Sequence, residues 1–189
     1  MKIKLISFFI IGLCITHFSF GQTNMDIIAV LNDSTRTFNI QHKIEYENSS
    51  PDTLTSIYLN DWANSYKDKS TPLAKRFAED YIRRFHFAKT EERGNTRMYS
   101  VSDANQMPYY WERPIYAADI IRIDLDKPLL PGEKQIINLL YSVKVPSDKF
   151  TRYGYDDEGN FKLNYWYVTP AVYKKGWQIY SDKNLGHQY

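Results

Sequence analysis

The chain has 189 residues, of which 43% are hydrophobic and 16% aromatic, and its formal net charge is +2. This length suffices for one domain with a core of ordinary size. Lys2 and Lys4 account for the excess charge, because the other 22 of the 24 basic residues balance the 22 acidic ones. Such a balance, without a Lys/Arg-dense patch, argues against a nucleic-acid-binding protein, whose affinity depends on neutralising phosphates.

Residues 1–21 have the pattern of a secretory signal peptide. The segment starts with positive charge, continues with an apolar core too short to span a bilayer comfortably, and ends with small residues at Ser19 and Gly21. We expect cleavage before Gln22 and therefore an exported protein, with an uncleaved N-terminal anchor as the alternative. No second long apolar segment predicts a transmembrane span after signal removal.

The only cysteine, Cys14, lies within this segment. The mature chain is therefore expected to have no disulfide, no thiol nucleophile and no thiolate metal ligand.

The first part of the mature chain predicts antiparallel strands. Residues 38–46 alternate strictly between apolar and polar side chains, which makes this the clearest strand. A shorter strand at 26–31 precedes it across a hairpin turn at 32–34, and a third at 54–59 follows the turn residues 48–52. We expect these three strands to pair in succession.

One helix is predicted over residues 72–86. Thr71 can cap its N-terminus, and Pro72 suits the first helical position. Apolar side chains recur at three- and four-residue spacing, at Leu73, Ala74, Phe77, Ala78, Tyr81, Ile82 and Phe85. The helix should pack on the sheet or cap its open end.

Strand patterns return in the second half, with turn residues between them. They cover residues 96–101, 119–125, 137–145 and 161–167. Many short alternating strands separated by turns predict a mainly β fold, an antiparallel β-sandwich or open β-saddle with one inserted helix.

No constellation for catalysis is found. A hydrolytic zinc site of the peptidase type needs two histidines one helical turn apart with a glutamate between them, whereas His42, His86 and His187 stand singly. Neither a Gly-x-Ser-x-Gly elbow nor a Gly-rich phosphate loop is present. We predict no catalytic residue, cofactor-binding residue or metal ligand in this chain, and we interpret His42 as a core histidine.

Two polar motifs each have two interpretations. Residues 156–160 (DDEGN) loosely match an oxygen-rich calcium loop, and residues 48–50 (NSS) match a glycosylation sequon. Turn chemistry explains both and is favoured.

Aromatic residues gather late in the sequence, in the segment 164–173 (NYWYVTPAVY) and at Trp177. They could fill the core or a domain interface, or they could form an exposed platform that stacks on sugars. We favour core or interface, because alternation along a strand sends Tyr165 and Trp166 to opposite faces.

The segment 164–177 resembles a signature in the N-terminal domain of zinc aminopeptidases of the aminopeptidase N type, especially a secreted bacterial branch with the string Trp-Tyr-x-x-Pro-Ala-Val-Tyr. Weaker matches are the strand 38–46 with its following turn, residues 59–66 and the turn 130–133. In that family this domain is a β-saddle that covers one side of the peptidase active site, and the zinc site follows in a helical domain.

The resemblance implies that residues 22–189 are the non-catalytic N-terminal domain of an exported metallopeptidase, incomplete at the C-terminus. The zinc and the peptide substrate would belong to a catalytic domain in cis, and this chain alone would hydrolyse nothing. The implied wall of the cleft consists of Tyr165, Trp166, Tyr167, Pro170, Tyr173 and Trp177.

The family commonly places a glutamine just before the aromatic pair, where it helps to bind the amino end of a peptide. This chain has Tyr165 there, so no substrate-binding residue is carried over. The alternative function is a stand-alone exported β-sandwich that binds a glycan or a protein through its late aromatic cluster.

Overall fold

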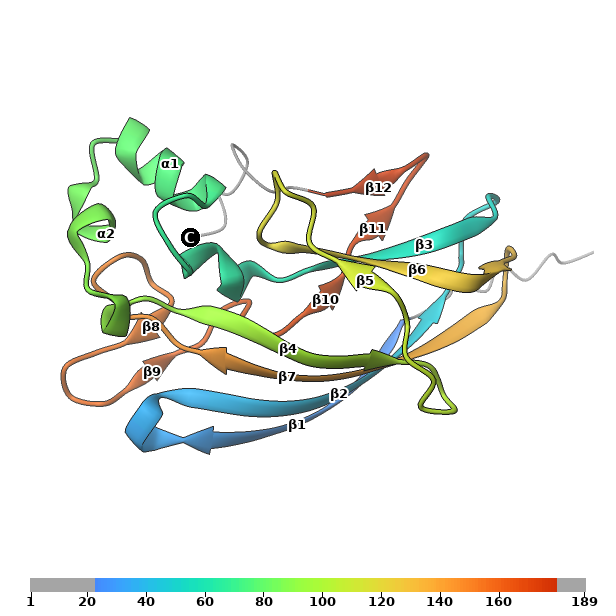
Figure 1. Cartoon of the computed structure of the whole chain (residues 1–189), viewed down its shortest axis with the longest axis horizontal. Coiled ribbons are helices and arrows are strands. Elements are labelled where there is room, and N and C mark those ends of the chain that lie inside the picture. The colour runs from blue at the N-terminus through green and yellow to red at the C-terminus, as the bar shows by residue number, and fades with distance from the viewer. Residues whose placement is uncertain (1–22, 180–189) are drawn as a thin grey trace, which may run out of the picture.

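The computed structural model describes residues 23–179, which form two antiparallel sheets in two layers, with the helices at one end (Figure 1). This arrangement confirms the predicted mainly β, sandwich-like fold. The predicted signal peptide, residues 1–21, and residues 180–189 lie outside the described part.

The first sheet has the strand order β1-β2-β7-β4. Its members are β1 (Asn24–Asn32), β2 (Thr37–Glu47), β7 (Lys134–Lys144) and β4 (Asn95–Ser102). The alternation predicted for residues 38–46 is confirmed, because the apolar set of β2 faces the core and the polar set faces solvent. A 3-10 turn, η1 (Asp33–Thr35), joins β1 to β2.

The second sheet has the order β10-β3-β6-β5. It contains β10 (Thr169–Pro170), β3 (Leu54–Asn60), β6 (Ile120–Leu129) and β5 (Trp111–Glu112). Two small hairpins complete the strands: β8 (Gly154–Tyr155) with β9 (Phe161–Lys162), and β11 (Val172–Tyr173) with β12 (Trp177–Gln178). The core lies between the sheets and includes Ile40, Ile44, Ile57, Leu59, Ile121, Ile123, Tyr141 and Val143.

The expected succession of three paired strands is wrong, because the chain changes sheets after β2. The fully buried Asn48 links the segment that leaves β2 to the segment that joins β6 to β7, where the chain changes sheets a second time. Its Nδ2 donates to the carbonyls of Asp52 and Leu129 at 2.8 and 2.9 Å, and its backbone bonds Gly132 and Glu133. The Asn48 Oδ1 also accepts from the Ser50 N–H at 3.2 Å, which confirms turn chemistry for the NSS motif.

The helix predicted over 72–86 is two helices, α1 (Pro72–Glu79) and α2 (Arg83–Phe87). The predicted cap is confirmed, since the Thr71 hydroxyl accepts from the Ala74 N–H at 3.2 Å. Tyr81 breaks the helix with a left-handed backbone (φ 60°) and is 85% exposed, which makes its place on the predicted apolar stripe wrong. This bend between α1 and α2, which we call the elbow, brings Phe85 into contact with Phe77 at a centroid distance of 5.6 Å.

A buried polar network joins the layers near the 3-10 helix η2 (Trp62–Tyr66). The Asp61 carboxylate pairs with Arg113 and accepts from the Thr96 hydroxyl at 2.6 Å. Asn64 Nδ2 donates to the Ala118 carbonyl at 2.6 Å. Because each buried group has a partner, the network avoids the cost of unpaired burial. A last 3-10 helix, η3 (Thr90–Glu92), leads into β4.

Candidate functional site

The segment expected to form a strand at 161–167 is a strand only at β9, so the strand expected through Tyr165 and Trp166 is wrong. The expected difference between these two side chains is found, since Tyr165 is exposed and Trp166 is partly buried. Tyr165 has a left-handed backbone (φ 52°), which interrupts any strand, and its side chain is 53% exposed. Trp166 turns inward and packs on Phe38 at a centroid distance of 4.8 Å. Tyr167 lies edge-on to Trp166 at 5.6 Å.

Tyr141 ties this segment to the first sheet. Its hydroxyl accepts from the Val168 N–H at 3.2 Å and lies 3.2 Å from His42 Nδ1. Burial raises the pKa of Tyr141, so the phenol stays neutral and can donate its proton to the imidazole. The Tyr167 ring lies edge-on to His42 at 6.3 Å.

His42 is a core histidine, as predicted, with 2% of its surface exposed. Burial lowers its pKa to about 4, although the Asp26 carboxylate acts in the opposite direction. The imidazole is therefore neutral at pH 7. Its Nε2 has no hydrogen-bond partner among residues 23–179.

The rest of the aromatic segment pairs with the second sheet, and Trp177 also contacts the first. Pro170 lies opposite Leu59 in the β10–β3 pair, and the Ala171 N–H donates to the Tyr58 carbonyl at 2.9 Å. Trp177 contacts the rings of Tyr46, Tyr58 and Tyr173 at centroid distances of 5.9, 5.6 and 5.3 Å.

A cavity of about 290 Å³ opens beside the β11–β12 hairpin. Pro170 and Tyr173 line it, together with Tyr46 and Ser50. The Tyr173 hydroxyl donates to Asp52 at 3.0 Å, and this bond raises the pKa of the phenol.

The six predicted wall residues therefore fall into two groups. Trp166 and Tyr167 contact side chains of the first sheet and follow the exposed Tyr165. Pro170 pairs with the second sheet, and Trp177, with Tyr173 against it, contacts both sheets. Sequence reasoning missed the anchors Phe38 and Tyr141. The strand alternation shows which of these side chains face inward, but it does not show what packs on them.

No group of three or more His, Cys, Asp or Glu side chains within residues 23–179 is arranged to hold a metal ion. The loop 156–160 is a turn, as favoured, since Asp156 accepts backbone bonds from Glu158 and Asn160 at 3.0 and 2.8 Å. Hydrogen bonds from Asn160 lower the pKa of the Asp156 carboxyl. In the same part of the chain, every helix is too short or too polar to span a bilayer.

No protein-family model matches this chain, and no similar curated protein is found. The likeness of segment 164–177 to the aminopeptidase N type thus stays a prediction from the sequence.

Proposed function

We propose that this chain is the non-catalytic N-terminal β-domain of an exported zinc metallopeptidase of the aminopeptidase N type, in which the segment 164–177 walls one side of the peptide cleft. The observation that carries the proposal is how this segment is held. Trp166 packs on the first sheet through Phe38, and Trp177 packs between Tyr46 of the first sheet and Tyr58 of the second. Tyr165, between β9 and β10, is 53% exposed.

A cleft wall has to be rigid, because binding energy is lost when a contact surface must first be ordered. Aromatic packing at both ends and the Tyr141–Val168 hydrogen bond meet this need. Tyr165 is the only one of the six wall side chains that is more than half exposed, and it is the one available for contact with a peptide.

The competing function, a glycan-binding module, requires aromatic faces that are free to stack on sugar rings. Three of these side chains instead pack against other aromatic rings and are partly buried, namely Trp166, Tyr173 and Trp177. This packing supports the domain-wall role over the glycan platform.

The proposal assigns the zinc ion, the water-activating glutamate and the peptide substrate to a catalytic domain in cis. The role of this chain is to bind and orient the substrate and to exclude water from one side of the cleft. No residue of this chain is assigned a catalytic role, and neither nucleic acid nor a membrane span belongs to the proposal.

The test uses the protein encoded by the natural reading frame that contains this chain. We expect an in-frame His-Glu-x-x-His motif, bound zinc and hydrolysis of aminoacyl-4-nitroanilides. In that protein, Tyr165→Ala should raise KM several-fold with a smaller effect on kcat, because a wall residue contributes mainly uniform binding.

Tyr110→Ala is the matched control, since Tyr110 is a tyrosine of similar exposure, 65%, outside the aromatic segment. If both substitutions change KM equally, Tyr165 does not contact the peptide as a wall residue. Saturable quenching of tryptophan fluorescence by oligosaccharides, abolished in Trp177→Phe, would favour the glycan module instead.

A further inference from the structure

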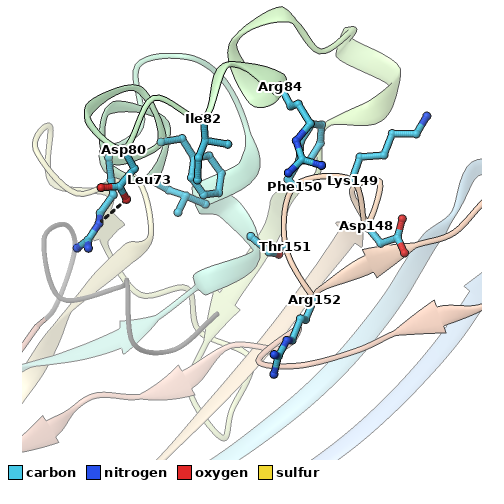
Figure 2. Close-up of a pocket in the computed structure, with 11 residues that line it drawn as sticks. Leu73, Asp80, Ile82, Arg84, Asp148, Lys149, Phe150, Thr151 and Arg152 are labelled. Carbon is cyan, nitrogen blue, oxygen red and sulfur yellow. Dashed lines mark hydrogen bonds and ion pairs between the residues drawn. The ribbon is translucent and has the colours of Figure 1, made fainter.

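A second cavity, of about 410 Å³, lies between the helices and the loop 148–152 that follows β7 (Figure 2). Its floor is apolar and well packed: Leu73, Phe77 and Phe150 are each less than a tenth exposed. Phe85 supports the floor and contacts Phe77 and Phe150 edge-on at 5.6 and 5.0 Å. The cavity is thus a fixed feature of the packing at this end of the sandwich.

The elbow at Tyr81 shapes one wall of this cavity. The Ile82 N–H turns back to donate to the Phe77 carbonyl at 2.6 Å, which holds α2 against α1. As a result, Ile82 and Arg84 both line the cavity, whereas Arg83, one residue earlier, does not.

The two acidic groups at the cavity are already neutralised. Asp80 pairs with Arg76 at 3.3 Å, and Asp148 pairs with Lys162 at 2.8 Å. Lys149 also lies near acidic groups, 3.5 Å from the Glu92 carboxylate.

Two arginines at the rim remain without an ion pair or hydrogen bond to any other residue between 23 and 179, namely Arg84 and Arg152. Arg84 extends from α2 toward Phe150, whereas Arg152 lies at the far end of the loop with its guanidinium directed away from Arg84 (Figure 2). Arg84 therefore places one unpaired guanidinium group beside the apolar floor (Figure 2). This positive charge disfavours a cation, and the apolar floor disfavours a simple inorganic anion.

We propose that this cavity binds a carboxylate joined to an apolar group, such as the C-terminal residue of a hydrophobic peptide or an N-acyl amino acid. Guanidinium groups bind carboxylates through two parallel hydrogen bonds, and the phenylalanine floor removes the apolar group from water. The volume falls within the range of about 300–1,000 Å³ that is usual for small-ligand sites. The proposal does not depend on the peptidase assignment, because it uses none of the residues of segment 164–177.

The test titrates the purified full chain with N-acetyl-L-phenylalanine and with its uncharged amide, using isothermal calorimetry and ¹H–¹⁵N correlation spectra. We expect the acid to bind about tenfold more tightly than the amide, with spectral changes around the loop 148–152. Binding of the acid should weaken with added salt, because the arginines are exposed.

Arg84→Gln should weaken binding of the acid about fivefold and leave binding of the amide unchanged, whereas Arg152→Gln, whose guanidinium points away from Arg84 (Figure 2), should have a smaller effect. Arg83→Gln is the matched control, because it removes the same charge from the same short helix without touching the cavity. All three side chains are exposed, so the variants should fold like the parent protein, which far-UV circular dichroism can verify.

A tripeptide pair, Gly-Gly-Phe and its C-terminal amide, distinguishes the two sources of the carboxylate. Tighter binding of Gly-Gly-Phe than of the acyl amino acid assigns the site to peptide C-termini, and the reverse assigns it to small acids. The proposal is overturned if neither acid binds, if acid and amide bind equally, or if Arg83→Gln weakens binding as much as Arg84→Gln.

Discussion

His42 connects the chemistry of single residues to the stability of the sandwich. It stands in the middle of β2 among apolar neighbours, and its neutral ring accepts or shares the hydroxyl proton of Tyr141. Tyr141 in turn holds Val168 of the aromatic segment. Protonation of the imidazole would place a cation in the core and disturb its hydrogen bond with Tyr141, whose hydroxyl positions the aromatic segment.

Acid should therefore destabilise the protein through His42. Its pKa is about 4 in the folded protein and 6.5 in the unfolded chain, so the unfolded state binds the extra proton between these values. The stabilisation is complete above pH 6.5 and is lost as the pH falls toward 4. Between pH 7 and pH 5 the free energy of unfolding should fall by about 2 kcal/mol more in the parent protein than in His42→Asn.

Urea unfolding at the two pH values measures this difference. Using the variant as the reference cancels the contribution of carboxylates such as Glu45, whose pKa is lowered by its hydrogen bond to Lys134. The same pH dependence in both proteins would contradict the assignment to His42.

Asn48 is the residue on which the two sheet crossings depend. Asn48→Ala leaves the carbonyls of Asp52 and Leu129 without their donor, and we expect the free energy of unfolding to fall by about 2–3 kcal/mol. Ser49→Ala, at an exposed neighbour, should change it by less than about 0.5 kcal/mol. Thermal or urea unfolding tests both, and a tolerated Asn48→Ala would show that the crossings hold without this side chain.

At the scale of elements, the strand β1 is notable because most of its residues are exposed. It is an edge of the first sheet, nine residues long, and carries Ile28 and Val30 at 65% and 62% exposure. The other long edge strand, β4, is partly covered, since Thr96 bonds the Asn64 side chain. An uncovered apolar edge offers backbone groups to another strand.

Val30→Lys should therefore reduce concentration-dependent self-association of the chain, because a charged edge residue opposes strand pairing. Leu140→Lys is the control, since it adds the same charge to the outer face of β7, an inner strand. Sedimentation velocity over a range of concentrations measures the effect. If the two variants behave alike, surface hydrophobicity and not the edge drives association.

The long strands could be predicted because burial on one face imposes a period of two. Their assignment to sheets could not, since β3 alternates in the same way whether it pairs with β2 or with β6. The helix break was missed because Tyr81 is not a residue type that marks a left-handed turn. The break in the strand expected at 161–167 was missed for the same reason, since Tyr165 is also left-handed. The cavity with Arg84 was missed because it is formed by the helices and by the loop 148–152, which are far apart in the sequence.

At the scale of the whole molecule, the proposed role is that of a supporting domain. Its sheets bury an apolar core, and its late aromatic segment packs on both of them. The proposed partner, a zinc-bearing catalytic domain in cis, would supply the reaction, while this domain supplies one wall and the cavity beside the helices.

The most direct test of this account is the zinc content of the purified chain together with its activity on aminoacyl-4-nitroanilides. The account predicts no stoichiometric zinc and no hydrolysis above the uncatalysed rate, including after incubation with zinc salts. One zinc per chain with turnover that a chelator abolishes would contradict it, because the reactive ion and its ligands would then belong to this chain itself.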